Sequence, residues 1–406
     1  MVHEHCILAF MQYRKLQAGK IFNGFNWLND GQVVIVDENS TIQNIVSKDE
    51  AGEGIERFEG VLAPGLVNCH CHLELSHLKN VVPPNTGLVN FLLAVIKKRA
   101  ASEKEILKHI EAAEQEMFDN GIVAVADVCN TNHSIDVKRQ NRIHFHNLIE
   151  VINLYDENLD KQLLHFNHLL EAFKGLDAPK GSTSLTPHAP YSVSNGTFKA
   201  INKATLNGLI SIHNQEAFEE NEVFEKGQGD FLRLYEALGA PSLPVEISGK
   251  TSLQTWLPHF TNGQTLILVH NTFISEEDIL FAKTHEEKYG IELIYCVCPN
   301  ANLYIENKLP PIDLLLKHNC KMVIGTDSYS SNWQLNIASE IKTLCTHFPK
   351  LELETVLGWA TINGAEALRQ NSFLGSLEKG KKPGIVLLET DSLNIDSITG
   401  KSRRII

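Results

Sequence analysis

Short apolar runs recur eight times between residues 61 and 328, and they constrain the fold more than any other feature. They span residues 61–70, 121–130, 142–151, 182–190, 209–216, 265–271, 291–300 and 321–328. Dense Val, Ile and Leu content over so few residues is typical of strands that are buried on both faces of a parallel sheet. Eight such strands are the number that a closed parallel α/β barrel requires.

Amphipathic helical patterns lie between most of these runs. Ser102 and Glu105 have the spacing of a helix-capping box, and so do Ser275 and Asp278. Residues 310–311 are both proline and stand where the start of a helix tolerates proline. Strand runs that alternate with helices indicate a parallel sheet covered by those helices. We therefore predict an α/β fold with a (β/α)8 TIM-like barrel.

The two ends of the chain have a different, β-rich pattern. Residues 31–36 and 41–46 flank turn residues and predict a hairpin, and further short strands are expected at 384–388 and 402–406. We expect both ends to pair as one small β-sandwich domain that is discontinuous in the sequence. The predicted limits are 1–60 and 373–406 for this domain, and 61–372 for the barrel.

The composition argues against several classes of partner. A net charge of −13 and a pI near 5.8 argue against binding to nucleic acid or to an anionic membrane surface. The opening segment MVHEHCILAF lacks the basic region of a signal peptide, and no apolar run approaches the length that spans a bilayer. The two C-x-C pairs at residues 69–71 and 296–298 are expected to be reduced buried thiols. We therefore expect a cytoplasmic protein.

Polar side chains follow the apolar runs at the strand ends where a barrel builds its active site. These residues are His70, His72, His188, His213, His270 and Asp327. Each histidine alone would be interpreted as a hydrogen-bonded residue without a metal. Together with Asp327, however, the histidines lie at the carboxyl ends of five strands, and this shared position indicates one site. Three imidazoles and one carboxylate suit a catalytic divalent metal, with zinc expected first and iron as the alternative.

Several motifs carry a family resemblance. They are PGLVNCHCH, TPHAPYSVS, SIHNQEAFEE, LVHNT, CPNANLYI and GTDSYSSN, in this order along the chain. On these motifs the sequence resembles the amidohydrolase superfamily, in its cytosine-deaminase-like and chlorohydrolase-like branch of metal-dependent hydrolases. The resemblance covers essentially the whole chain, and it implies a barrel enzyme that acts on carbon–nitrogen bonds other than peptide bonds.

The resemblance also implies roles for individual residues. The ligands of one metal would be His70, His72, His213 and Asp327. Glu216 would be the general acid/base, although without the spacing from His213 it would be interpreted as a surface or helix-capping acid. His270 would orient the attacking water, Asp327 would accept its proton, and His188 would contact the substrate. Relatives with two metals carry a bridging lysine at the fourth strand, and no lysine occurs between residues 182 and 188.

The substrate is less constrained than the chemistry. The segment HLELSHLKN resembles a subgroup that includes aminodeoxyfutalosine deaminases, so we expect a deaminase of an adenosine derivative or another amino-substituted N-heterocycle. Glu74 and Ser76 would then be substrate-binding candidates, or Glu74 would brace a metal-ligating histidine. The alternatives are a triazine chlorohydrolase, a ring-opening amidohydrolase and a non-catalytic scaffold. The expected partner is a small-molecule substrate, and a homodimer is expected only at the level of the family.

Two loops have predicted positions. The loop over residues 73–89, which follows the first barrel strand, should lie over the metal and shape specificity. The connection over residues 239–262, which contains Trp256, should lie at the opposite, N-terminal face of the barrel.

Overall fold

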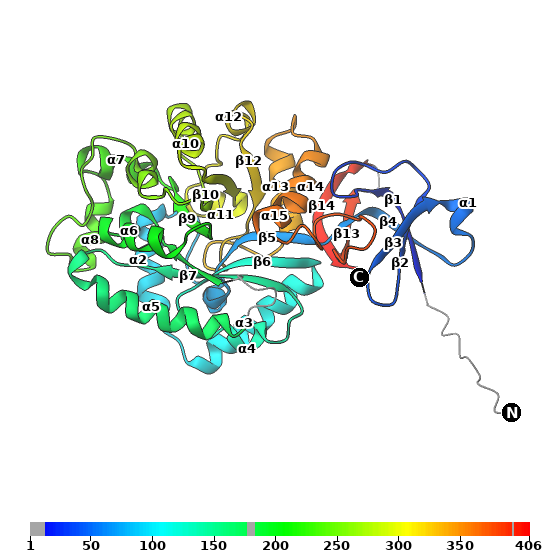
Figure 1. Ribbon diagram of the computed structural model, residues 1–406, viewed down its shortest axis with the longest axis horizontal. Coiled ribbons are helices and arrows are strands. Elements are labelled where there is room, and N and C mark those ends of the chain that lie inside the picture. Colours follow the sequence, from blue (N-terminus) through cyan, green and yellow to red (C-terminus); the bar gives the residue numbers. More distant parts are fainter. Residues whose placement is uncertain (1–12, 177–182, 392–393) are drawn as a thin grey trace.

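A computed structural model describes residues 13–176, 183–391 and 394–406; the opening segment MVHEHCILAF and Ser182 lie outside these ranges. Its larger part contains eight parallel strands in two sheets of four, with helices around them (Figure 1). The first sheet contains β5 (Leu66–Cys71), β6 (Ile122–Cys129), β7 (His144–Val151) and β8 (Thr183–Pro187). The second contains β9 (Leu209–Asn214), β10 (Thr265–His270), β11 (Glu292–Val297) and β12 (Lys321–Ile324).

Hydrogen bonds join the two sheets along both of their seams. Between β8 and β9, the His213 backbone N–H donates to the His188 carbonyl over 3.0 Å. Between β12 and β5, the backbone N–H groups of Thr326 and Asp327 both donate to the His70 carbonyl over 3.0 Å. The predicted α/β fold, a barrel of parallel strands, is confirmed.

Helices follow the strands, as the alternating pattern predicts. They are α2 (Leu88–Lys98), α3 (Glu103–Asp119), α4 (Ile135–Lys138), α5 (Leu159–Lys174), α6 (Asn195–Ala204), α7 (Phe218–Lys226), α8 (Phe231–Ala237), α9 (Ser252–Trp256), α10 (Glu276–Tyr289), α11 (Pro299–Ile305), α12 (Ile312–Lys317), α13 (Ile337–His347), α14 (Leu353–Ala360) and α15 (Ile362–Ala367). The capping box of α10 is complete, with Ser275 and Asp278 bonded in both directions. At α3 only half of the predicted box forms, because Ser102 accepts from the Glu105 N–H without a return bond. In the described part of the chain, no helix combines the length and apolarity needed to cross a membrane.

The first predicted run divides at Gly65 into strands of two different sheets. A Cβ at this position would lie 2.2 Å from the Val123 side chain, so only glycine fits the turn. The residues before it belong to β4 (Ile55–Pro64), and those after it belong to β5. The sheet formed by the terminal strands therefore continues to Pro64.

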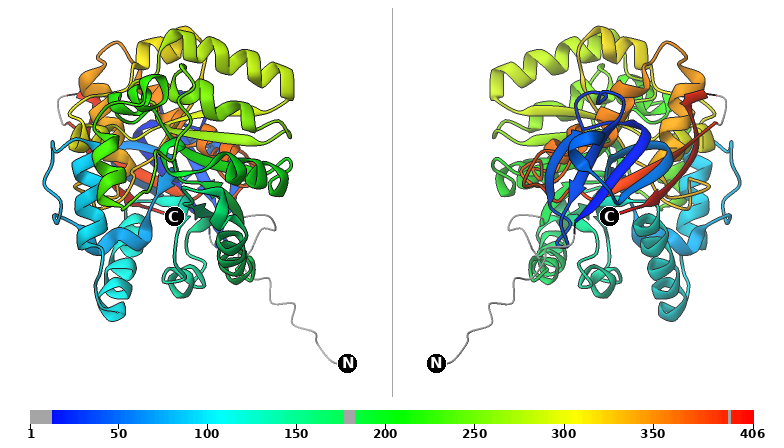
Figure 2. Two further views of the ribbon diagram at one scale, coloured as in Figure 1. Left: turned by 90° about the vertical axis from the view of Figure 1, so that its left-hand side faces the viewer. Right: turned by 90° about the vertical axis from the view of Figure 1, so that its right-hand side faces the viewer.

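Strands from both ends of the chain form one six-stranded sheet at one end of the molecule (Figures 1 and 2). Its order is β14-β13-β4-β1-β2-β3, with β1 (Arg14–Ile21), β2 (Gln32–Val36), β3 (Ile42–Ser47), β13 (Ile385–Asp391) and β14 (Asn394–Arg404); the short α1 (Lys48–Ala51) follows β3. The discontinuous β domain and the β2–β3 hairpin are confirmed. A β-sandwich would have two facing sheets. Here the strands form one sheet, because β13 pairs edge to edge with β4. The exact domain limits stay a prediction.

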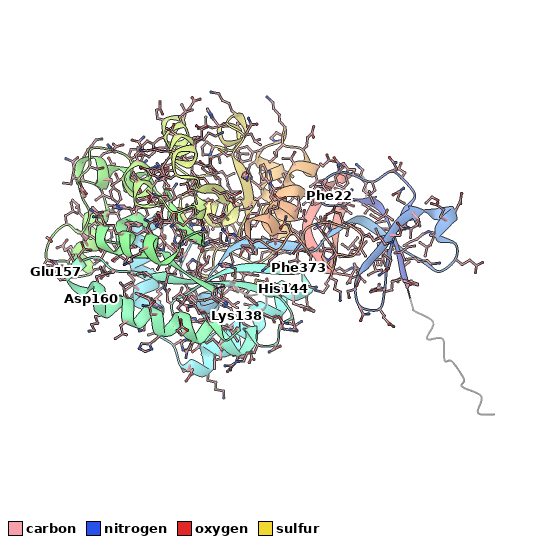
Figure 3. The ribbon with its side chains drawn as sticks, in the orientation of Figure 1. Phe22, Lys138, His144, Glu157, Asp160 and Phe373 are labelled. Carbon is pink, nitrogen blue, oxygen red and sulfur yellow. The ribbon has the colours of Figure 1, made fainter. Side chains whose placement is uncertain are left out.

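The barrel and the terminal sheet are in direct contact. The Arg404 guanidinium donates to the carbonyls of Phe118 and Ile122 over 2.9 and 2.6 Å, and it lies 4.0 Å from the centre of the Phe118 ring. His144 at the start of β7 lies beside Phe373, with ring centres 5.1 Å apart (Figure 3). These contacts hold the C-terminal segment against the barrel.

Substitution of Gly121 tests this close contact. A Cβ at Gly121, where φ is +81°, would lie 2.5 Å from Val386 Cγ2 in β13. Gly31 is the control, because it has a similar φ of +79° and a Cβ there would have no other atom within 4 Å. Gly31→Ala should therefore lose only the cost of the backbone conformation, about 1–2 kcal/mol. We expect Gly121→Ala to lose a further amount of about 1–3 kcal/mol through overpacking, measured as a lower midpoint of thermal unfolding. Equal midpoints for the two variants would contradict the packing described here.

Candidate active site

Four predicted metal ligands meet at the carboxyl ends of the barrel strands. His70 lies in β5, His72 directly follows it, His213 lies in β9, and Asp327 follows β12. One ligand atom from each lies within 4.8 Å of all the others. His72 Nε2 lies 3.2 Å from His70 Nε2 and 3.3 Å from His213 Nε2. Asp327 Oδ1 lies 3.5 Å from the Nε2 atoms of both His70 and His72.

This spacing fits a divalent metal. Bonds of about 2.0–2.2 Å place the ligand atoms of tetrahedral zinc about 3.3–3.6 Å apart, which is close to the distances between these four groups. A hydrogen-bond network explains the cluster less well, because His72 Nε2 faces two imidazole nitrogens and a carboxylate oxygen at once. An imidazole nitrogen carries either one proton or one lone pair, so it can satisfy only one of them.

Burial keeps the histidines in the form that binds a metal. It lowers the pKa of His70 to about 3, with a smaller contribution from His188, and it is also the main cause that lowers the pKa of His213 to about 4. Neutral imidazoles therefore predominate near pH 7, and each has a nitrogen lone pair to donate. His213 Nδ1 lies 2.7 Å from the His188 carbonyl oxygen, which can only accept. The proton is therefore on Nδ1, and the lone pair of Nε2 points at the cluster.

Glu216 and His270 lie beside this cluster. Glu216 Oε1 is 3.5 Å from His270 Nε2, and both residues are buried. Burial raises the pKa of Glu216 well above its usual value, and the nearby Asp327 carboxylate raises it further. A protonated Glu216 can donate a proton to a bound molecule. His270 Nε2 is buried without a hydrogen-bond partner among the described residues, so it is free to bond a ligand or a water molecule.

Several side chains of the site sit on strained backbone. His270 and Asn271 have φ of +75° and +57°, and Asp327 has φ of +58°. L-residues rarely adopt this region, and each instance costs about 1–3 kcal/mol. Such geometry bends the chain sharply at the strand ends, where His270 and Asp327 line the cavity and the Asn271 side chain donates to the Leu268 carbonyl over 2.8 Å. Sequence reasoning missed it because none of these residues is glycine.

A cavity of about 290 Å³ opens from the metal cluster toward the surface. Its inner wall carries His72, His188, His213, Glu216, His270 and Asp327. Its outer wall is largely apolar and is formed by α2 and α8 with flanking residues: Leu75, Leu88, Phe91, Leu92, Val95, Ile96, Leu234, Tyr235 and Leu238. Leu75 and Leu88 come from the predicted loop over residues 73–89, which therefore reaches the cavity as expected.

Glu74 and Ser76, predicted to bind substrate, do not line this cavity. One oxygen of the buried Glu74 carboxylate accepts from the backbone N–H groups of Asn130 and Thr131 over 3.0 and 2.9 Å. Ser76 Oγ donates to the Leu73 carbonyl within its own turn over 2.7 Å. The turn that follows His72 points both side chains away from the cavity. The structure also shows no bond from Glu74 to a metal-ligating histidine, so Glu74 anchors the loop after β6.

Sequence reasoning missed Glu150 and Asn130, which line the cavity next to His188 and His213. Glu150 belongs to the third apolar run and Asn130 closes the second. The rule that selected the histidines, a polar residue at the carboxyl end of a barrel strand, would have found both.

The expected position of the connection over residues 239–262 is only partly right. Trp256 does not line the main cavity, as predicted, and is buried. However, its Nε1 donates to Asn214 Oδ1 over 2.9 Å, at the carboxyl end of β9. The part of this connection around Trp256 therefore packs behind the active-site end of the barrel. Only its last residues approach the N-terminal face, where the Asn262 carbonyl accepts from the Asn207 N–H.

Comparisons with known proteins agree with this architecture. The model of the amidohydrolase family matches residues 61–404, so the chain belongs to that family. A 5′-deoxyadenosine deaminase of Methanococcus maripaludis is 29% identical over 358 residues, which cover 84% of this chain and 78% of that protein. A 5-methylthioadenosine/S-adenosylhomocysteine deaminase of Teredinibacter turnerae is 24% identical over 357 residues, or 83% of this chain and 74% of that protein.

Solved structures share the fold over nearly the whole chain. The Helicobacter pylori aminofutalosine deaminase, in complex with methylthio-coformycin, matches with a TM-score of 0.81 at 21% identity, covering 97% of this chain and 100% of that chain. An adenosine deaminase from Xanthomonas campestris with bound zinc matches with a TM-score of 0.69 at 22% identity, covering 96% and 92%.

Removal of single histidines tests the ligand set. His213 and His188 lie at the ends of adjacent strands, but only His213 belongs to the four-residue cluster. We expect His213→Asn to reduce the bound metal from about one equivalent per chain to a small fraction, because one of four ligands is lost. His188→Asn should retain the metal. Elemental analysis of both purified variants measures this, and equal loss in the two would contradict the ligand set.

Proposed function

We propose that the protein is a metal-dependent deaminase that replaces the exocyclic amino group of an adenine nucleoside with oxygen from water and releases ammonia. The observation that carries this proposal is the buried carboxyl group of Glu216, whose pKa burial raises well above its usual value, beside four converging metal ligands. An adenine ring has a nitrogen next to the carbon that bears the amino group, and it needs a proton at that nitrogen when water attacks.

The residues of the site divide this work. A divalent metal held by the cluster would lower the pKa of a water molecule to about 7. Asp327 accepts a proton from the attacking water, and His270 accepts or donates a hydrogen bond that orients it. Glu216 delivers a proton to the ring nitrogen, so that no negative charge builds up on the ring as the carbon becomes tetrahedral. Asp327 passes the proton that it took from water to the amino group, which leaves as ammonia. Glu216 recovers a proton from the new hydroxyl group, whose oxygen stays on the ring as a carbonyl.

We infer one metal per chain, with zinc first and iron as the alternative. Three imidazole nitrogens and one carboxylate oxygen are a common catalytic zinc set when a coordination position stays open. The strand β8, Thr183–Pro187, contains no lysine that could bridge a second metal. A cytoplasmic location, the absence of nucleic-acid and membrane partners, and a homodimer stay predictions.

The apolar outer wall supports a substrate with an apolar group on the 5′ carbon. With the base at the metal, the sugar and then the 5′ group would extend toward α2 and α8. Leu88, Phe91 and Leu92 of α2 meet Leu234 and Leu238 across this part of the cavity. A 5′-deoxy, 5′-methylthio or aryl group, as in aminodeoxyfutalosine, would bury apolar surface there. Arg99 lines the same cavity and gives it one cationic side chain. The names 5′-deoxyadenosine deaminase and 5-methylthioadenosine deaminase agree with this class, although the second relative is also named for S-adenosylhomocysteine, which has an amino-acid tail.

Glu216→Gln tests the chemistry. Glutamine keeps the shape but cannot deliver the proton, so we expect kcat to fall by about 10²–10⁴-fold with metal content and fold unchanged. The assay is release of ammonia from 5′-deoxyadenosine. Glu219→Gln, three residues away and partly exposed, is the matched control and should keep full activity. If Glu216→Gln turned over normally, or if wild-type protein released chloride from a chlorotriazine and no ammonia, the deaminase proposal would be wrong.

Leu92→Asn tests the apolar wall. Leu92 lines the cavity, and its neighbour Leu93 on α2 does not, although both are partly buried. A polar group facing the 5′ carbon should lower kcat/KM for 5′-methylthioadenosine by about 10-fold, and it should affect adenosine, with its 5′ hydroxyl, much less. Leu93→Asn should change neither value. A similar loss for both nucleosides would indicate that the wall does not contact the 5′ group.

A further inference from the structure

Glu150 is a buried carboxylate in the cavity wall that no step of the proposed reaction uses. It is the next-to-last residue of β7 and is only 2% exposed, yet it lines the cavity beside His188 and His213. Burial of an acid at such a position is costly unless hydrogen-bond donors compensate for the lost water.

The chain supplies Glu150 with few donors. Asn130 Nδ2 donates to Glu150 Oε2 over 2.9 Å, and no other hydrogen bond to this carboxylate exists among the described residues. Glu150 Oε1 lies 3.9 Å from His213 Nδ1, too far for a hydrogen bond, and that N–H already donates to the His188 carbonyl over 2.7 Å. A carboxylate can accept about four hydrogen bonds, so Glu150 retains acceptor capacity on the side of the cavity.

Glu220, another buried acid near the site, receives more donors from the chain than Glu150 does. Glu220 accepts from the backbone N–H groups of Gln215 and Glu216 over 2.9 and 3.2 Å, and also from Ser252 Oγ. Glu220 does not line the cavity. Glu150 differs in both respects, because it faces the cavity and lacks donors. This combination indicates that a bound molecule supplies the missing donors.

We propose that Glu150 determines specificity for the sugar by accepting hydrogen bonds from the ribose hydroxyl groups of the substrate. This inference rests on the proposed nucleoside deaminase function. Glu150 lines the same cavity as His213 and the apolar side chains of α2 and α8, so it can reach the sugar of a nucleoside whose base lies at the metal. Hydroxyl groups are the donors that a nucleoside offers between its base and its 5′ group. Asn130 holds one oxygen of the carboxylate in place, so the other faces the sugar.

The experiment compares three nucleosides that differ only in sugar hydroxyls: 5′-deoxyadenosine, 2′,5′-dideoxyadenosine and 3′,5′-dideoxyadenosine. We expect wild-type protein to prefer the first over at least one of the others by about 10–100-fold in kcat/KM, the range for a hydrogen bond to a charged group. In Glu150→Leu this preference should fall to less than about 3-fold, because an apolar side chain cannot accept from a hydroxyl. Glu150→Gln, which keeps a neutral acceptor, should give an intermediate preference and decides the test if the leucine variant does not fold.

Glu74→Gln is the matched control. Glu74 is also a buried acid that bonds Asn130, but through the backbone and outside the cavity, so this variant should keep the wild-type preference. A preference that survives in both Glu150 variants, or wild-type protein without any preference, would overturn the role of Glu150. A uniform loss on all three nucleosides would also overturn it, because Glu150 would then act on the base. If wild-type protein releases no ammonia from any of them, the deaminase proposal itself fails.

Discussion

The backbone hydrogen bonds of the proposed metal ligands also join the two halves of the barrel. The His70 carbonyl accepts the N–H groups of Thr326 and Asp327 at one seam, and the His213 N–H donates to the His188 carbonyl at the other. The ligands from the first, fifth and eighth strands therefore cannot separate without breaking a seam of the fold. A metal bound at this point would stabilise the closed barrel, because it would bind the folded state and not the unfolded chain.

Buried acids outside the cavity fix the loops that carry the reactive side chains. Asp127 accepts from the Leu73 N–H over 2.8 Å, immediately after the ligand His72. Glu220 accepts from the N–H of Glu216 itself over 3.2 Å. Each bond satisfies a backbone donor that would otherwise be buried and unpaired at the end of a strand. Irregular backbone at the active-site end can therefore be buried. These bonds also fix the positions of His72 and Glu216.

The sequence predicts the barrel and the metal cluster well because both depend on local patterns, namely apolar runs and the polar residue that ends each run. It predicts poorly what depends on the path of the chain after a strand. Glu74 and Ser76 follow the metal pair closely, but a tight turn points them away from the cavity. Glu150 has the same strand-end position as the histidines, but the prediction followed the residues of the metal motifs and did not include it. The positive φ of His270 and Asp327 has no sequence signal, since tertiary contacts impose it.

The cavity combines two parts with different structural origins. Its inner end comes from the strand ends of the barrel, where seam bonds and strained backbone leave little freedom to change. Its outer end comes from α2 and α8, two helices inserted after β5 and β9 that pack on each other in a separate apolar cluster. Side chains in this cluster can change without disturbing a seam or a ligand. The proposed reaction therefore depends on the barrel, and the inserted helices offer the part of the cavity wall that can vary with the substrate.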